Sequence, residues 1–201
     1  MTNYQKQMEN VIANLAGKPR LLLHACCAPC SISALEKLDK YFDVTLYFYN
    51  PNIDSIEEFD LRLAQFDKLK GVFEFKLVAQ KYEHSEFLDK LSNLADEREG
   101  GARCKGCIAL RLAKTFQYAK DNGFDYVATT LTSSPMKDAE FINQTGLKLA
   151  QEFKINYLVS DFKKKDGYLH SLRLCEKLNI YRQHYCGCEF GKAQQNLDEK
   201  F

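Results

Sequence analysis

All but one of the eight cysteines stand in three short groups, so thiol chemistry is the first function to consider. The groups are Cys26, Cys27 and Cys30, then Cys104 and Cys107, and finally Cys186 and Cys188. Packing in a hydrophobic core does not require cysteines to cluster in this way. In a reducing cytosol, clustered cysteines are more often metal ligands or redox thiols than structural disulfides. The remaining cysteine, Cys175, lies in an apolar helical pattern and is expected in the core.

The first two groups could enclose one metal centre. Cys26 and Cys27 follow an apolar run, and Cys104 and Cys107 open a helical stretch, where the positive potential of a helix N-terminus favours thiolates. Soft thiolates select zinc or iron–sulfur centres. Structural zinc sites usually draw on separated C-x-x-C pairs, whereas adjacent ligands suit the wider span of a cluster. An iron–sulfur centre is therefore favoured, with zinc and metal-free redox thiols as alternatives. Cys30 either binds a second metal or packs in its helix.

Cys186 and Cys188 predict a different chemistry. Two thiols separated by one residue can close a very small disulfide ring, for which Gly187 supplies the backbone freedom. Strained disulfides are reduced more readily and tend to be catalytic or regulatory. The alternative is a pair of ordinary thiols.

Polar residues near these groups have two interpretations each. His24 ends a predicted strand, and His184 precedes the third cysteine group, so each is either a ligand or supporting residue or a histidine bonded to the backbone. Residues 129–138 follow a strand and open a helix. One interpretation is a loop that binds a phosphate or another polar ligand, and the other is a connecting loop that only caps the helix. Residues 49–52 have the same placement and the same ambiguity.

The length and charge of the chain limit the possible classes. A chain of 201 residues is expected to form a single domain, 1–201. The net charge of +1 gives no indication of nucleic-acid binding by itself. Such binding would need a local basic face, for which residues 163–165 and 98–111 are candidates, although both can be ordinary solvated surface. Residues 1–17 lack a long apolar run, which predicts a cytoplasmic protein without a signal peptide or membrane span.

The elements that must position these residues alternate between strands and helices. Alternating and β-branched apolar residues predict strands at 20–25, 43–49, 73–78, 125–131 and 157–160. Helical spacing predicts helices at 1–16, from about 30 to 41, and at 56–69, 85–94, 108–121, 137–153 and 171–178. This order predicts an α/β fold with a mainly parallel sheet flanked by helices. Cys26 would then lie at the carboxyl end of the first strand, where open α/β sheets bind ligands.

Five motifs together resemble the QueH family of epoxyqueuosine reductases. They occur in the family's order over roughly residues 18–190 and are His24-Ala25-Cys26-Cys27-Ala28-Pro29-Cys30, Tyr49-Asn50-Pro51-Asn52, Arg103-Cys104-Lys105-Gly106-Cys107, residues 130–138, and Tyr181-Arg182-Gln183-His184-Tyr185-Cys186-Gly187-Cys188. The resemblance implies a fold like the adenine-nucleotide α-hydrolase-like (Rossmann-like) domains. The ATP-using relatives have a glycine-rich phosphate loop after the first strand, where this chain has Cys26 to Cys30. ATP-dependent chemistry is therefore disfavoured.

The resemblance also implies a reaction and its cofactors. A member of this family removes the epoxide oxygen of epoxyqueuosine at the wobble position of tRNA, without cobalamin, and so completes queuosine synthesis. The implied partners are this tRNA and a low-potential electron donor. A 4Fe–4S cluster would be held by Cys26, Cys27, Cys104 and Cys107, with an additional metal ion near Cys30. Cys186 and Cys188 would form a redox-active disulfide.

This reaction consumes two electrons and two protons and releases water, so a proton donor is needed. The candidates are Asp138, Tyr185, His24 and His184. An exposed wobble base would stack on aromatic side chains, for which Tyr49, Tyr181 and Tyr185 are candidates. Arg182 and the lysines at 163–165 could contact phosphates.

Three other functions remain open at this level. One is a nucleotide-dependent tRNA-thiolating enzyme, which needs an ATP site. Another is a zinc-stabilised tRNA-binding module without catalysis. The third is a thiol–disulfide reductase similar to heterodisulfide reductases, whose motifs also combine adjacent cysteines with C-x-x-C.

Overall fold

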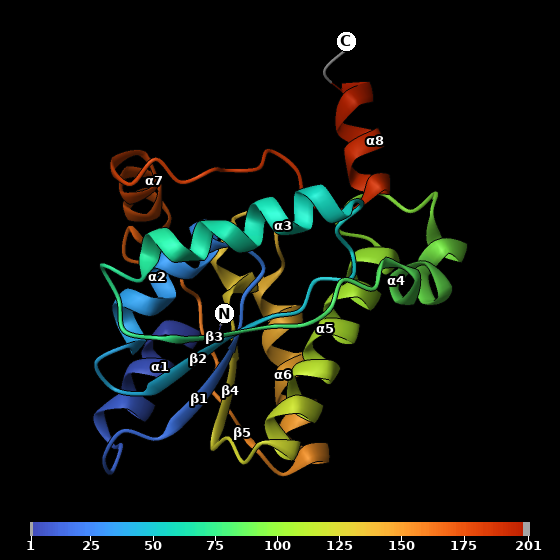
Figure 1. Cartoon of the computed structure of the whole chain (residues 1–201). Helices are drawn as coiled ribbons and strands as arrows, with labels where there is room; N and C mark the ends of the chain where they lie inside the picture. Colours follow the sequence, from blue (N-terminus) through green and yellow to red (C-terminus); the bar gives the residue numbers. More distant parts are fainter. Residues whose placement is uncertain (1, 199–201) are drawn as a thin grey trace.

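The computed structural model describes residues 2–198, and its centre is an all-parallel sheet (Figure 1). The strand order is β3-β2-β1-β4-β5. The strands are β1 (Arg20–His24), β2 (Asp43–Phe48), β3 (Lys76–Ala79), β4 (Tyr126–Thr129) and β5 (Asn156–Tyr157). Each pairing between these neighbours is parallel, which confirms the predicted fold class.

Helices follow almost every strand, as parallel connections require. They are α1 (Tyr4–Ala13), α2 (Ala28–Leu38), α3 (Ile56–Ala64), α4 (His84–Leu91), α5 (Ala102–Asp121), α6 (Ala139–Phe153), α7 (Gly167–Lys177) and α8 (Glu189–Asp198), with 3-10 turns η1 (Gln65–Leu69), η2 (Ser92–Leu94) and η3 (Thr130–Ser133). Within residues 2–198, none of the helices combines the length and the apolar character needed to cross a membrane.

The sheet is buried on both faces. Successive residues of β1 point to opposite sides, so Leu21 and Leu23 join one core with α2, whereas Leu22 joins the other core with Phe116 of α5. In Figure 1, α1, α2 and α7 lie on one side of the sheet, and α5 and α6 lie on the other. This double coverage explains why β1 reads as a continuous apolar run.

Several element boundaries differ from the predicted ones. Helix α5 begins at Ala102 rather than at residue 108, because the extended Gly101 precedes it and the Glu97 carboxylate accepts a hydrogen bond from the Ala102 N–H. The strand expected to reach residue 131 ends at Thr129 and turns into η3. Helix α8 was not predicted, and the contact of its Phe190 with Phe87 of α4 is a long-range contact. The predicted N-terminal helix is present as α1, while residue 1 lies outside the described residues.

Candidate metal and substrate site

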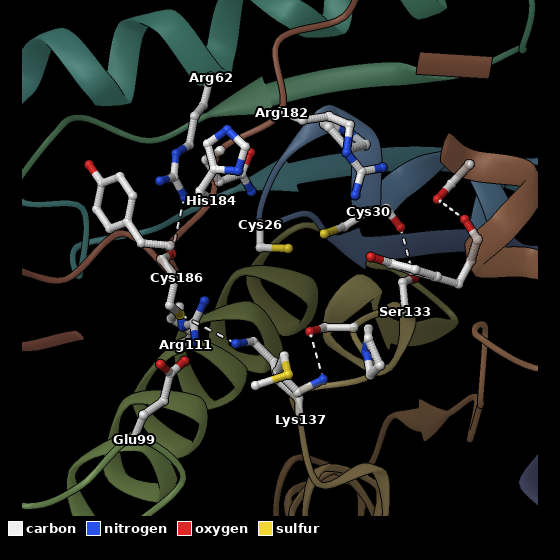
Figure 2. Close-up of a pocket in the computed structure, with 18 of the residues that line it drawn as sticks. Cys26, Cys30, Arg62, Glu99, Arg111, Ser133, Lys137, Arg182, His184 and Cys186 are labelled. Atoms are coloured by element: carbon white, nitrogen blue, oxygen red, sulfur yellow. Dashed lines mark hydrogen bonds between the residues drawn. The ribbon is translucent and has the colours of Figure 1, made fainter. Parts of the chain in front are cut away.

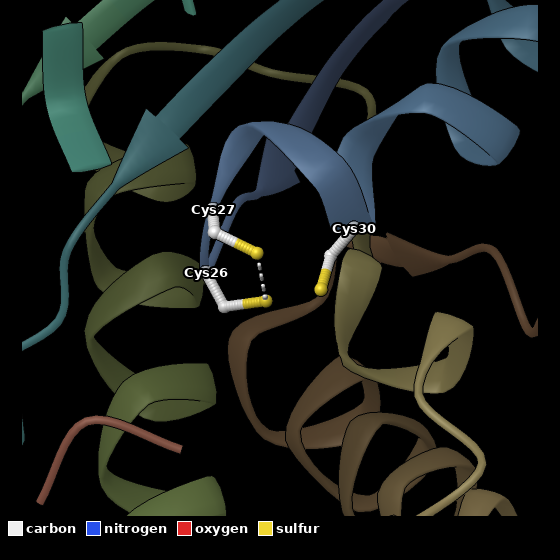
Figure 3. A group of neighbouring side chains, drawn as sticks. All are labelled: Cys26, Cys27 and Cys30. Carbon is white, nitrogen blue, oxygen red and sulfur yellow. Dashed lines mark hydrogen bonds between the residues drawn. The ribbon is translucent and has the colours of Figure 1, made fainter. Parts of the chain in front are cut away.

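The loop between β1 and α2 gathers three thiols. Cys26, Cys27 and Cys30 offer sulfur atoms that all lie within 4.8 Å of one another (Figure 3). Cys27 has an extended backbone and caps α2, and Pro29 occupies the first turn, where its missing N–H costs no helical hydrogen bond. Cys30 follows three residues later, so the helix returns its side chain to the same face as Cys27. We call these three residues the cysteine trio.

The cysteine trio concentrates negative charge on one sulfur. Hydrogen bonding from Cys27 and then Cys30 holds the pKa of Cys26 well below its ordinary value. Burial, together with the hydrogen bond to Cys26, raises the pKa of Cys27 to about 12. The same contacts with Cys26 and Cys27 raise the pKa of Cys30. A soft metal would displace the two shared protons, because only deprotonated thiols are ligands.

Helix α5 carries the second pair, Cys104 and Cys107, in its first turns. Cys107 is buried and Cys104 is half-buried. Both line a cavity of about 50 Å³, together with Cys186 and Cys188. The N-terminal location on α5 adds positive potential around these sulfurs.

A larger cavity of about 420 Å³ adjoins the first and opens at the carboxyl ends of the strands. Figure 2 shows the side chains that point toward it, among them Cys26, Cys30, Arg111, Lys137 and Cys186. Three of these, Arg111, Lys137 and Cys186, line both cavities. A volume of this size is typical of small-ligand sites, and the location is the usual one in open α/β sheets. We call it the main cavity.

The structure brings the predicted ligands to one region in two subsets. Cys26 and Cys27 lie close together, with their sulfur atoms 3.8 Å apart, and Cys30 completes the trio. Cys104 and Cys107 do not belong to this 4.8 Å group but line the adjoining cavity. The four-residue ligand set for one cluster therefore stays a prediction. The residues present fit a thiolate-bound centre, because the donors are soft, half-buried or buried, and near buried cations.

The predicted disulfide between Cys186 and Cys188 is absent, because all eight cysteines are free. Different partners hold the two sulfurs. Lys137 Nζ donates a hydrogen bond to Cys186 Sγ at 3.3 Å, and the Gly191 N–H donates to Cys188 Sγ at 3.3 Å. Cys188 also packs in an apolar cluster, which raises its pKa to about 11 through burial. The structure therefore does not support the disulfide that the resemblance implies, and the two side chains make different contacts instead.

Lys137 is a site residue that the sequence did not single out. Burial alone would raise the pKa of Cys186, but the charges of Lys137 and then Arg111 hold it below its ordinary value. In turn, the charge of Cys186 raises the pKa of Lys137. The two side chains therefore form a thiolate–ammonium pair at the wall shared by both cavities. The only sequence indication was the position of Lys137 in a loop that opens a helix.

The four candidate proton donors have different environments. His24 is fully buried, with its ring nitrogens 3.0 Å from Thr129 Oγ1 and 3.1 Å from the Tyr49 carbonyl oxygen. Burial and then the charge of Arg111 lower its pKa to about 4, so it is neutral near pH 7. Asp138 lines the small cavity, and its Oδ1 accepts the Phe141 N–H at the start of α6.

The other two donors line the main cavity. The Tyr185 hydroxyl donates a hydrogen bond to Asp54 Oδ1 at 3.1 Å, whereas His184 is exposed to solvent.

The predicted base and phosphate contacts are partly corrected. Tyr49 is buried in the core and its hydroxyl donates to Glu86, so it offers no stacking surface. Tyr181 donates to Glu58, and of the three tyrosines only Tyr185 lines the main cavity. Arg182 also lines this cavity and lies 5.8 Å from the ring centre of Tyr168.

The three lysines at 163–165 are not a free basic patch. Lys163 and Lys164 form ion pairs with Asp161, at 3.0 and 3.7 Å. Lys165 pairs with Glu9. Their charges are therefore compensated within the chain, which weakens the predicted phosphate contact.

Comparison with known proteins adds a family match to this geometry. The family model described as Epoxyqueuosine reductase QueH matches residues 21–194. The chain is 40% identical to the Epoxyqueuosine reductase QueH of Staphylococcus aureus, over 98% of this chain and 87% of that protein. It is 32% identical to the Epoxyqueuosine reductase QueH of Thermotoga maritima, over 87% of this chain and 91% of that protein.

Among solved structures, one similar chain is the U34-tRNA thiolase NcsA from Methanococcus maripaludis with its 4Fe–4S cluster. The TM-score is 0.48 and the identity 15%, over 97% of this chain and 73% of that one. Similarity at this level says nothing about cofactor or substrate.

Proposed function

Because the chain belongs to the QueH family of epoxyqueuosine reductases, we propose that it reduces epoxyqueuosine to queuosine at the wobble position of tRNA. It is then an oxidoreductase of queuosine biosynthesis that works in the cytoplasm without cobalamin. The observation that carries this proposal is the thiol-lined main cavity at the carboxyl ends of β1 and β4, which family motifs surround. The reaction takes up two electrons and two protons and releases the epoxide oxygen as water.

We assign Cys26, Cys27, Cys104 and Cys107 as the residues that would hold a 4Fe–4S cluster. Their soft sulfur donors and their placement near two helix N-termini support this assignment. When bound, such a cluster supplies electrons one at a time. The enzyme therefore needs a low-potential one-electron donor, used twice in each turnover. Cys30 would remain available for an additional metal ion.

The residues of the chain supply and hold protons. Lys137 Nζ carries a proton at the wall of the main cavity, and the Cys186 thiolate 3.3 Å away keeps that ammonium in place. We assign Lys137 as the donor of the first proton to the departing oxygen, with solvent in the cavity as the source of the second. Asp138, Tyr185 and His184 are the alternative donors, because each lines one of the two cavities. Cys186 and Cys188 remain candidate redox thiols.

The wobble base would enter the main cavity from the anticodon loop, whose bases can splay out of the stack. The rim supports this placement, since Arg182 and Tyr185 line the cavity and the side chain of Met136 is 75% exposed there. These residues offer a cation for phosphate and apolar or aromatic surfaces for a base.

The test is turnover of tRNA that bears epoxyqueuosine. Protein purified without oxygen is incubated with this tRNA and a low-potential reductant, and the nucleosides are then analysed. We expect queuosine to form without added cobalamin and without ATP consumption. The Cys175→Ala variant is a matched control, because Cys175 lies in the core outside the three groups. Unchanged epoxyqueuosine with a protein that holds its cluster would contradict the proposed reaction.

A further inference from the structure

Two buried polar residues connect the cysteine-bearing segments. Arg111 and Asn50 are each 2% exposed. Arg111 Nε donates a hydrogen bond to the carbonyl oxygen of Cys107 at 3.3 Å, and its Nη1 donates to Asn50 Oδ1 at 3.4 Å. Asn50 Nδ2 then donates to the carbonyl oxygen of Ala25 at 2.9 Å, directly before Cys26. A continuous chain of hydrogen bonds therefore joins α5 to the loop of the cysteine trio.

The guanidinium of Arg111 lacks a carboxylate partner. Among residues 2–198, no Asp or Glu forms an ion pair with it, and the acceptors of its hydrogen bonds are the carbonyl oxygen of Cys107 and the amide oxygen of Asn50, both neutral. Burial of an uncompensated cation is costly. The groups nearest to Arg111 include sulfurs, because Arg111 lines the main cavity with Cys26 (Figure 2), lines the small cavity with Cys107, and shares both cavities with Cys186.

We propose that Arg111 and Asn50 are positioning residues for the iron–sulfur centre, with separate tasks. Asn50 fixes the distance between the loop of Cys26 and helix α5. Arg111 places a permanent positive charge between the two cysteine pairs and so stabilises the reduced, more negative state of the centre. The inference rests on the proposed 4Fe–4S cluster but not on its substrate.

The proposed role of the Arg111 charge is tested by measuring the reduction potential of the cluster. The measurement is an anaerobic redox titration that is monitored by electron paramagnetic resonance. Arg111→Gln should shift the one-electron equilibrium at least tenfold toward the oxidised state, which corresponds to a potential about 59 mV more negative. Arg111→Lys keeps a cation and should restore most of the potential. Lys120→Gln removes an exposed cation from the same helix and should change nothing.

The hydrogen-bonded link from Arg111 through Asn50 to Ala25, which we call the bridge, is tested by the rate at which a chelator removes iron. Asn50→Ala keeps the cation but cuts the link to Ala25, so it should lose iron several-fold faster while its potential stays near that of the parent. Asn143→Ala is the matched control, because Asn143 is a buried amide whose side chain donates to the carbonyl oxygens of Ala139 and Ser160 and to no cysteine-bearing segment. Asn50→Asp places a carboxylate against Arg111 and should lower the potential.

The outcomes separate the two proposals. An unchanged potential in Arg111→Gln with full iron and sulfide would overturn the role of its charge. Equal iron loss in Asn50→Ala and Asn143→Ala would overturn the bridge. A parent protein without iron and sulfide would overturn both this inference and the proposed cofactor, whereas a parent with a cluster but no turnover would overturn the proposed reaction alone. If Arg111→Gln does not fold, Asn50→Asp measures the same charge effect.

Discussion

The cysteine trio and the Cys186–Cys188 segment lie on the same cavities but differ in what their sulfur atoms contact. In the trio, sulfur contacts sulfur, and Cys26 and Cys27 are 3.8 Å apart. In the C-terminal segment, Cys186 contacts the ammonium of Lys137, and Cys188 accepts a backbone N–H. Three sulfurs that lie together could hold a metal ion, whereas a thiolate paired with an ammonium holds opposite charges at one place in the cavity wall. Proximity of cysteines in sequence therefore does not define one chemistry.

The largest expected effect comes from the trio. Replacing Cys27 by Ser removes a soft buried donor, so protein purified without oxygen should lose the brown colour and most of its iron and sulfide. We expect about four iron and four sulfide ions per chain in the parent, as a 4Fe–4S centre requires. Metal and sulfide analysis measures this difference, and circular dichroism checks that the variant is folded. Stoichiometric zinc without sulfide in the parent would favour a zinc module instead.

The next effect concerns Lys137 and should leave the metal centre intact. Lys137→Gln removes the ammonium beside Cys186, so turnover should fall by roughly 10²-fold, in line with the loss of an acid catalyst. The pKa of Cys186 should also rise, because the charge that lowers it is gone. Alkylation of Cys186 in metal-free protein, followed by mass spectrometry across pH, should then need a more alkaline solution. An identical alkylation profile in both proteins would show that Lys137 does not stabilise the thiolate.

A smaller effect is expected from the backbone of the C-terminal segment. Gly187 has a φ of 122°, and a Cβ there would lie 3.1 Å from Arg62 Nη1. Its carbonyl oxygen accepts the Asp54 N–H, so the residue fixes the segment against the loop after β2. Gly187→Ala should reduce the free energy of unfolding by about 1 to 3 kcal/mol. Urea denaturation measures this change, and Gly71→Ala, which adds a Cβ in open space, should cost far less.

The smallest effect is expected at the surface. Lys163 is already paired with Asp161, so Lys163→Gln should change tRNA affinity little. Arg182→Gln should weaken binding and reduce the salt dependence by about one phosphate contact, because this residue lines the main cavity. Titrations at several salt concentrations compare the two variants. A larger loss with Lys163→Gln would place the tRNA on the face near α1 and α7 instead.

The sequence predicted the parts of the site that local patterns control. The apolar run before Cys26 indicated a buried strand, and the cysteines after it were correctly expected at its carboxyl end. The contact between Lys137 and Cys186 could not be predicted, because 49 positions separate them and neither residue has a local pattern that requires the other. The structure does not contain the expected disulfide, and spacing could not reveal that Lys137 and Gly191 contact the two sulfurs instead.

The same limit applies to charges. A run of three lysines indicated a basic surface, but the acids that neutralise it come from elsewhere in the fold, as with Glu9 and Lys165. Arg111 shows the opposite case. In the sequence, Arg111 belongs to a basic stretch at 98–111. Only the packing of α5 against β1 shows that Arg111 is buried beside Cys107.

The wall of the main cavity that runs from Arg182 to Cys186 is one of the last parts of the chain to be synthesised. The ribosome completes the trio and helix α5 long before it reaches this wall. A nascent chain can therefore fold its central strands while the thiols still face solvent on one side. If the thiols hold the proposed cluster, residues 182–186 are among the last parts of the cavity wall to be added around them.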